Sequence, residues 1–262
     1  MDNLFRDIIP DHKGTLVIFL IFYKRISDIS EFKSDYNLPL QARVSSLRNS
    51  IAHNLSVSTF DNFDFGIQYL ANEFAQISDF FYEQFASLRS LDEKVVFEAL
   101  SVLNSFETSK LEDRKFGRIF EYLIHKSFTV NKDGSYFTPQ PVAELFSNLV
   151  NTDTVTEIYD PCAGLGGLLT EINKQLNQKH VHYFASEINS RIASLGTLNL
   201  ILNGVRNFKY RNADSLRNPF DKNFDLIVSD LPLISKFNEN IDFPLFITLA
   251  FQYPPKTLVP QH

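Results

Sequence analysis

The sequence has a single cysteine, no tryptophan and no long apolar run among its 262 residues. One thiol, Cys162, excludes an internal disulfide framework and is typical of a reducing cytoplasm. The first apolar run, Leu16–Tyr23, is far shorter than the roughly 20 residues that cross a bilayer. Charged residues precede that run, so it does not resemble a signal peptide. We therefore expect a cytoplasmic globular protein without a membrane segment.

Metal-ligand spacing and strong positive charge are also missing. The six histidines show no spacing with cysteine or acidic residues that is typical of a metal site, so no metal is expected. The net charge is −6, and neither half of the chain is a polycation. Tight unaided binding to nucleic-acid phosphates is therefore not predicted, and a nucleic-acid function would need a partner.

The first part of the chain has apolar residues at helical spacing. The predicted helices are Thr15–Ile29, Leu40–Leu55, Phe65–Leu88, Ser90–Leu103 and Phe116–Phe128. An Asn-Lys-Asp-Gly turn at 131–134 marks a boundary. We expect a helical N-terminal domain over residues 1–130 and a second domain over residues 131–262.

In the second part, short apolar runs alternate with helical segments. The predicted strands are Val155–Tyr159, Val181–Ser186, Phe208–Arg211 and Phe224–Ser229, and the predicted helices are Gly167–Leu176 and Ile188–Leu202. This alternation predicts an α/β fold, a mainly parallel sheet with helices on both faces. Asn238–Phe251 is expected to form the next helix, after which prolines interrupt the pattern, so we expect an incomplete domain.

The strongest local feature is Asp-Pro-Cys-Ala-Gly-Leu-Gly-Gly at 160–167, between a strand and a helix. Its glycines let the backbone approach a ligand, and the helix N-terminus favours an anion. Asp160 ends the strand before this loop, where it can meet a cation. Glu187 ends the next strand, where it can accept hydrogen bonds from ribose hydroxyls. A dinucleotide site and a tight turn without a ligand stay open, although Asp-Pro is not part of the dinucleotide pattern.

These segments resemble the N-6 adenine DNA methylases, in particular the modification (M) subunits of type I restriction-modification systems. Residues 160–167 look like their S-adenosylmethionine (SAM) motif, and Gly134–Pro139 resembles their Phe/Tyr-Thr-Pro segment. Ser186–Asn189 and Leu198–Gly204 are similar to two further motifs. In the helical part, two segments resemble helices of the M subunit: Phe19–Asp28 and Gly117–Lys126.

The resemblance implies a Rossmann-like SAM-dependent methyltransferase domain that transfers a methyl group from SAM to adenine N6 in DNA. It also implies a DNA-specificity subunit and possibly a restriction subunit as partners. The implied cofactor-binding residues are Tyr136, Phe137, Thr138, Pro139, Asp160, Gly164, Gly166, Gly167, Glu187 and Asp214. Asp230 would accept hydrogen bonds from the target amine, Pro232 would help to position it, and Leu233 would cover the flipped base.

The catalytic tetrapeptide departs from the family pattern of Asn/Asp-Pro-Pro-Tyr/Phe, because residues 230–233 read Asp-Leu-Pro-Leu. Leu231 replaces a proline, and Leu233 replaces the aromatic residue whose stacking is worth about 1–3 kcal/mol per base. The alternative is therefore a catalytically degenerate SAM-fold scaffold or interaction protein. A methyltransferase acting on protein or another amine is a third interpretation.

Overall fold

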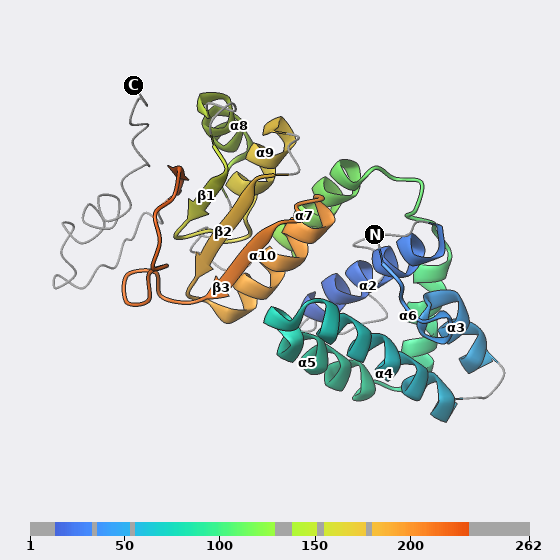
Figure 1. The fold of residues 1–262 in the computed structure, drawn as a ribbon. Coiled ribbons are helices and arrows are strands. Elements are labelled where there is room, and N and C mark those ends of the chain that lie inside the picture. The colour runs from blue at the N-terminus through green and yellow to red at the C-terminus, as the bar shows by residue number, and fades with distance from the viewer. Residues whose placement is uncertain are drawn as a thin grey trace, which may run out of the picture. The chain divides into compact units, whose positions relative to one another are not determined.

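The chain divides into two compact units, Met1–Lys132 and Asp133–His262 (Figure 1). The structure, a computed structural model, describes residues 14–32, 36–52, 56–128, 138–150, 155–176 and 180–230. No helix within these described stretches is long and apolar enough to cross a membrane.

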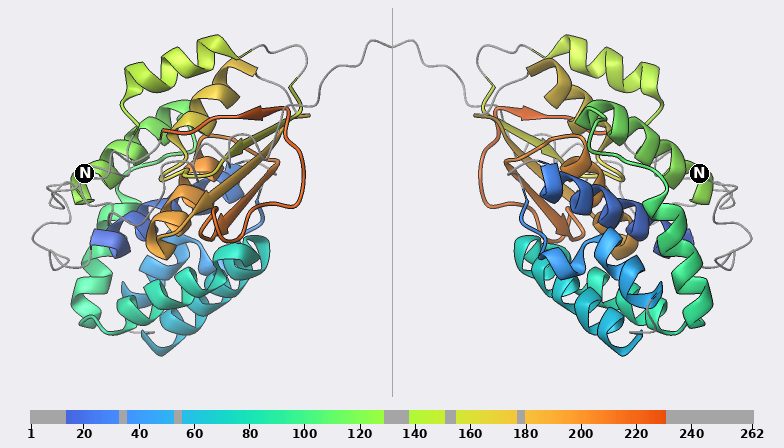
Figure 2. Two further views of the ribbon diagram at one scale, coloured as in Figure 1. Left: turned by 90° about the vertical axis from the view of Figure 1, so that its left-hand side faces the viewer. Right: turned by 90° about the vertical axis from the view of Figure 1, so that its right-hand side faces the viewer.

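The first unit is helical, as the sequence predicts, and is built around one buried helix. Its helices are α2 (Gly14–Phe32), α3 (Val44–Ala52), α4 (Ser56–Glu73), α5 (Ser78–Arg89), α6 (Glu93–Asn104) and α7 (Asp113–Phe128). Every residue from Ile18 to Tyr23 is at most 1% exposed, so α2 is enclosed on all sides. Helices α4 and α5 run side by side in all views (Figures 1 and 2).

Phenylalanine, abundant in the sequence, fills the core of this unit. Phe22 of α2 stacks on Phe81 of α5 with ring centroids 6.1 Å apart, and Tyr23 stacks on Phe63 of α4 at 4.5 Å. Such ring pairs stabilise a core beyond the area that they bury. The aromatic content therefore reflects packing in the first unit.

One predicted helix is divided in the structure. The apolar stripe over Phe65–Leu88 predicts a continuous helix, but a 3-10 turn at Ala75–Ile77 separates α4 from α5. Phe74 lies at this break, and its ring contacts those of Phe22 and Phe81 at 6.1 and 6.3 Å. The turn lets both helices pack against α2, and neither glycine nor proline marks it in the sequence.

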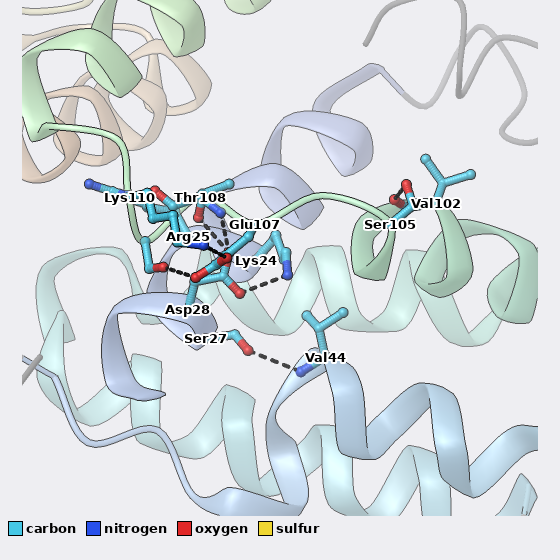
Figure 3. A network of polar contacts seen from close by, with 11 residues as sticks. Lys24, Arg25, Ser27, Asp28, Val44, Val102, Ser105, Glu107, Thr108 and Lys110 are labelled. Atoms are coloured by element: carbon cyan, nitrogen blue, oxygen red, sulfur yellow. Dashed lines mark hydrogen bonds and ion pairs between the residues drawn. The ribbon is translucent and has the colours of Figure 1, made fainter. Parts of the chain in front are cut away.

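A polar network at Arg25 crosses the buried side of α2 (Figure 3). Arg25 is 0% exposed and donates to the backbone carbonyls of Thr108 and Leu111. Its guanidinium also pairs with Asp113 at 2.7 Å and lies 4.9 Å from the Phe116 ring centroid. The arginine thus attaches α2 to the segment that leads into α7 and to α7 itself.

Asp28 completes this network (Figure 3). Its carboxylate pairs with Lys24 at 2.7 Å and accepts from both the backbone N–H and the hydroxyl of Thr108 at 2.7 Å. Lys24 and Asp28 are both buried. A buried charge is tolerated only when it is paired and hydrogen-bonded, and each charge here has such partners.

The second unit contains a four-stranded parallel sheet with the order β3-β2-β1-β4. Its elements are α8 (Gln140–Leu149), β1 (Glu157–Asp160), α9 (Gly167–Leu176), β2 (His182–Glu187), α10 (Ser190–Leu202), β3 (Phe208–Asn212) and β4 (Leu226–Ile227). The predicted alternation of strands and helices is confirmed. Helix α8 is not among the predicted helices, although proline in its first turn favours a helix start.

The two faces of the sheet are covered differently. Apolar residues of α8, α9 and α10 pack with Ile158, Tyr183 and Tyr210 on one face. On the other face, Tyr159 stacks on Phe224 at 4.7 Å, in a cluster supplied by the segment between β3 and β4. Within the described residues no helix covers this second face. The helix expected at Asn238–Phe251 lies outside them, so helices on both faces stay a prediction.

The strand order reverses beside β1. The chain passes from β1 to β2 and β3 in one direction, and β4 then pairs with the opposite edge of β1. In open parallel sheets, ligands bind at the carboxyl ends of the strands where the order reverses. The fold therefore directs attention to the residues that follow β1 and β4.

Candidate functional site

The loop after β1 has a backbone that only glycine adopts easily. Gly164 has a φ of 56° and Gly166 a φ of 76°, both in the left-handed region that L-residues with side chains avoid. The Gly166 N–H donates to the carbonyl of Ala163 at 2.7 Å, which closes a tight turn. Helix α9 begins at Gly167, so its first-turn N–H groups, which have no partner within the helix, adjoin the loop.

Asp160 is a buried carboxyl at the end of β1, only 1% exposed. Its pKa is raised to about 7, mainly by burial; the hydrogen bonds from the Cys162 N–H and the Ser229 hydroxyl lower the pKa, and the nearby charges of Asp230 and Glu187 add to the rise. Among the described residues, the groups that act on Asp160 include no cation. The carboxyl is therefore suited to a ligand that brings a positive charge.

Glu187, at the end of β2, is tied to the loop. One carboxylate oxygen accepts from the Gly164 N–H at 3.2 Å, and the other accepts from the Asn189 N–H at 2.8 Å. Burial raises the pKa of Glu187. A carboxylate has about four acceptor positions, so lone pairs remain for ligand hydroxyls. The next side chain, Ile188, is 70% exposed and offers an apolar surface beside them.

Two further predicted carboxylates follow β3 and β4. Asp214 accepts from the Leu216 N–H at 3.0 Å and pairs with the exposed Arg217 at 3.4 Å. Asp230 is exposed, and its charge acts on Asp160. The structure thus brings Asp160, Glu187 and Asp230 together at the carboxyl edge of the sheet.

The remaining predicted site residues belong to other segments. Thr138 and Pro139 directly precede α8, where the Pro139 carbonyl accepts from the N–H groups of Val142 and Ala143. Four predicted residues lie outside the described ones: Tyr136, Phe137, Pro232 and Leu233.

Cys162 lies in the loop but does not have the character of a nucleophile. Burial, together with the charges of Asp160 and Glu187, raises the pKa of its thiol to about 12. The reactive form of cysteine is the thiolate, so this side chain stays protonated at neutral pH. Its role in the loop is that of a small packing residue.

Three residues that sequence reasoning does not assign to the site support the loop. Tyr210 of β3 donates to the Gly164 carbonyl at 2.5 Å, and Asn199 of α10 donates to the Leu165 carbonyl at 2.9 Å. Gly196 of α10 lies so close that an added Cβ would stand 2.8 Å from the Gly164 carbonyl oxygen. The signals in the sequence were a glycine and an asparagine inside an apolar helix, and the asparagine lies in the segment Leu198–Gly204 that resembles a family motif.

Proteins with similar sequences are methylase subunits. The chain is 32% identical over 131 residues to the type I restriction enzyme MpnII methylase subunit of Mycoplasma pneumoniae, covering 45% of this chain and 24% of that protein. It is 28% identical over 131 residues to the type I restriction enzyme MjaVII methylase subunit of Methanocaldococcus jannaschii, and this match covers 48% of this chain and 23% of that protein. The matches thus span about a quarter of the length of these relatives.

Similar solved structures confirm the fold. The methyltransferase subunit of a type I restriction-modification system from Streptococcus thermophilus superposes with a TM-score of 0.72 and 20% identity, covering 88% of this chain and 61% of that one. A modification subunit of a putative type I restriction enzyme from Vibrio vulnificus superposes with a TM-score of 0.62 and 16% sequence identity, and the match covers 92% of this chain and 61% of that one. The fold is therefore a helical part followed by a Rossmann-like α/β domain, as in these two subunits. The N-6 DNA methylase family model matches residues 111–250, more than half of the sequence, and this chain therefore belongs to the N-6 DNA methylase family.

Proposed function

We propose that this chain binds SAM and acts as a DNA adenine-N6 methyltransferase subunit of a restriction-modification system. The observation that carries the proposal is Asp160, a buried carboxyl with a pKa of about 7 beside a glycine loop and without a cation among the described groups that act on it. The ammonium group of SAM would supply the missing charge. Family membership and the similar methylase subunits support the same function.

The described residues fit SAM in three places. Asp160 would hold the ammonium group, and Glu187 would accept hydrogen bonds from the ribose hydroxyls. Ile188 would offer an apolar surface beside the ribose. Asp214 would meet the adenine amine, since its ion pair with the 86% exposed Arg217 is weak enough to yield. The segment of Tyr136, Phe137, Thr138 and Pro139 would close over the methionine end. The bound cofactor supplies an electrophilic methyl group on its sulfonium.

The chain's own part in the reaction is orientation of the target amine. Asp230, exposed in the segment that follows β4, would accept hydrogen bonds from adenine N6, and Pro232 would help to position the base. Leu233 would cover the base without π-stacking. Catalysis by such a site rests on positioning and on pre-oriented charges rather than on covalent chemistry.

Substitution of Gly167 distinguishes a ligand contact from a packing contact. A Cβ added at this position meets no described atom within 4 Å, so Gly167→Ala is expected to leave the melting temperature of the ligand-free protein unchanged. If SAM lies against the loop, the added methyl group obstructs it, and we expect at least a tenfold weaker Kd by calorimetry. An unchanged Kd would place the ligand elsewhere.

Methyl transfer tests the role of Asp230. We expect the wild-type chain, supplied with SAM, DNA and a specificity subunit, to form N6-methyladenine that mass spectrometry detects. Asp230→Ala should lower the rate at least about a hundredfold and change SAM affinity little, because it removes an acceptor for the substrate amine. The matched control is Asp221→Ala, an exposed aspartate in the segment between β3 and β4, which should keep the wild-type rate. Equal rates for Asp230→Ala and wild type would refute this role.

The second candidate function is a SAM-fold scaffold without activity. The Asp-Leu-Pro-Leu sequence at 230–233 favours it, because a proline and the stacking aromatic of the family pattern are both replaced. SAM binding without methyl transfer, with or without a specificity subunit, would support this candidate. The DNA substrate, the specificity and restriction subunits, the cytoplasmic location and the domain assignment of 1–130 and 131–262 all stay predictions.

A further inference from the structure

Two buried side chains hold consecutive carbonyls of the glycine loop. The Tyr210 hydroxyl, from β3, donates to the Gly164 carbonyl at 2.5 Å, and the Asn199 amide, from α10, donates to the Leu165 carbonyl at 2.9 Å. Tyr210 is 4% exposed and Asn199 is 0% exposed. Water therefore does not compete for these carbonyls, and loss of either donor would leave a buried acceptor unsatisfied.

The contact of Tyr210 depends on a missing side chain. A Cβ on Gly196 would lie 2.7 Å from the Tyr210 hydroxyl oxygen and 2.8 Å from the Gly164 carbonyl oxygen. These distances are shorter than real Cβ contacts, so alanine at this position would push the loop and the tyrosine apart. Gly196 therefore makes room for the hydrogen bond between Tyr210 and Gly164.

The consequence is a fixed peptide plane. A trans peptide points its N–H opposite to its C=O, so the Tyr210 bond sets the direction of the Leu165 N–H as well as that of the Gly164 carbonyl. If the peptide between Gly164 and Leu165 rotated, its carbonyl oxygen would point in the direction in which the Leu165 N–H now points. We propose that Tyr210 and Asn199 are positioning residues for the cofactor, which keep the loop in the one shape that accepts SAM; this inference rests on the proposed function.

The second unit supplies a matched control for Tyr210. Tyr183 lies on the neighbouring strand β2, packs in the same cluster and is 2% exposed. Its hydroxyl is buried and has no hydrogen-bond partner among the described residues. Tyr183→Phe therefore removes the same atom from the same core without touching the loop.

The experiment compares Tyr210→Phe with Tyr183→Phe in the full chain. Calorimetry is expected to show about tenfold weaker SAM binding for Tyr210→Phe, equivalent to about 1.4 kcal/mol, and wild-type binding for Tyr183→Phe. Hydrogen exchange of the peptide that covers residues 160–167 should be faster in Tyr210→Phe alone. A general packing defect would instead speed exchange throughout the sheet.

Each outcome decides the inference. If wild type and Tyr210→Phe bind SAM equally and exchange equally in the loop, the positioning role is wrong and the proposed function stands. If the wild type does not bind SAM, the proposed function fails, and the cofactor role of Tyr210 fails with it. Faster loop exchange in Tyr210→Phe would then still show that the hydroxyl holds the loop.

Asn199 gives an independent test should Tyr210→Phe not fold. Asn199→Leu removes the donor to Leu165 from the other element. Its control in the same helix is Thr197→Val, which removes a hydroxyl that donates to the Ala193 carbonyl of α10. Weaker SAM binding for Asn199→Leu alone supports the inference. Equal binding by the two variants overturns the part assigned to Asn199.

Discussion

Asp160→Asn should stabilise the ligand-free protein at neutral and higher pH. The folded protein raises the pKa of Asp160 from 3.8 to about 7, mainly because burial disfavours its charged form. Above pH 7 the folded state must carry this buried charge, whereas asparagine keeps the shape and never ionises. At about 1.4 kcal/mol for each pKa unit, the free energy of unfolding should rise by up to about 4 kcal/mol.

The pH dependence identifies the carboxyl as the cause. Near pH 4 the folded state keeps the proton, and the unfolded state has released it in about half of the molecules, so the free energies of unfolding of variant and wild type should differ by less than about 1 kcal/mol. Between about pH 4 and 7 the unfolded state binds fewer protons, so wild-type stability falls as the pH rises, and above 7 the difference is constant.

Urea unfolding at several pH values measures this difference. Asp221→Asn, a substitution of an exposed aspartate, is the control and should match the wild type throughout. A constant difference between Asp160→Asn and wild type from pH 4 to 8 would contradict the account, because it could not come from ionisation of Asp160.

Arg25→Met should strongly destabilise the helical unit. Arg25 is 0% exposed, and its removal leaves the carbonyls of Thr108 and Leu111 and the carboxylate of Asp113 without this donor. Loss of one partner from a buried polar network costs about 3–5 kcal/mol, although methionine retains much of the packing volume.

Thermal and urea unfolding of Arg25→Met test this expectation. The matched control is Lys115→Met on α7, a 67% exposed cation whose ion pair with Glu112 should contribute less than about 1 kcal/mol. If the two variants lose similar stability, the buried network does not hold α2 to the segment before α7.

The sequence predicts which of these residues lie together at one edge of the sheet, because their positions depend on the strands that they end or follow. Asp160 and Glu187 each end a strand, the loop glycines follow one, and a parallel sheet brings the carboxyl ends of its strands to one edge. Helix α9 begins at Gly167 as predicted. The family match favours the methylase interpretation of this loop over the dinucleotide site that the glycines alone left open.

The support of the loop could not be predicted, because it depends on long-range contacts. Tyr210 is 46 residues from Gly164, and nothing in the local pattern of β3 marks its hydroxyl. The burial of Arg25 could not be predicted either, because its hydrogen-bond partners are 83 to 88 residues away in the sequence. The division between α4 and α5 follows from packing of Phe74 against α2 rather than from a helix-breaking residue.

SAM binding by calorimetry at pH 8 tests the central claim most directly, with wild type and Asp160→Asn compared. The variant is expected to be folded and more stable than the wild type, so a loss of binding cannot be attributed to unfolding. We predict a wild-type Kd on the order of micromolar and at least about a hundredfold weaker binding by Asp160→Asn. A folded wild-type chain that does not bind SAM, or a variant that binds equally well, would contradict the assignment of this edge of the sheet as the cofactor site.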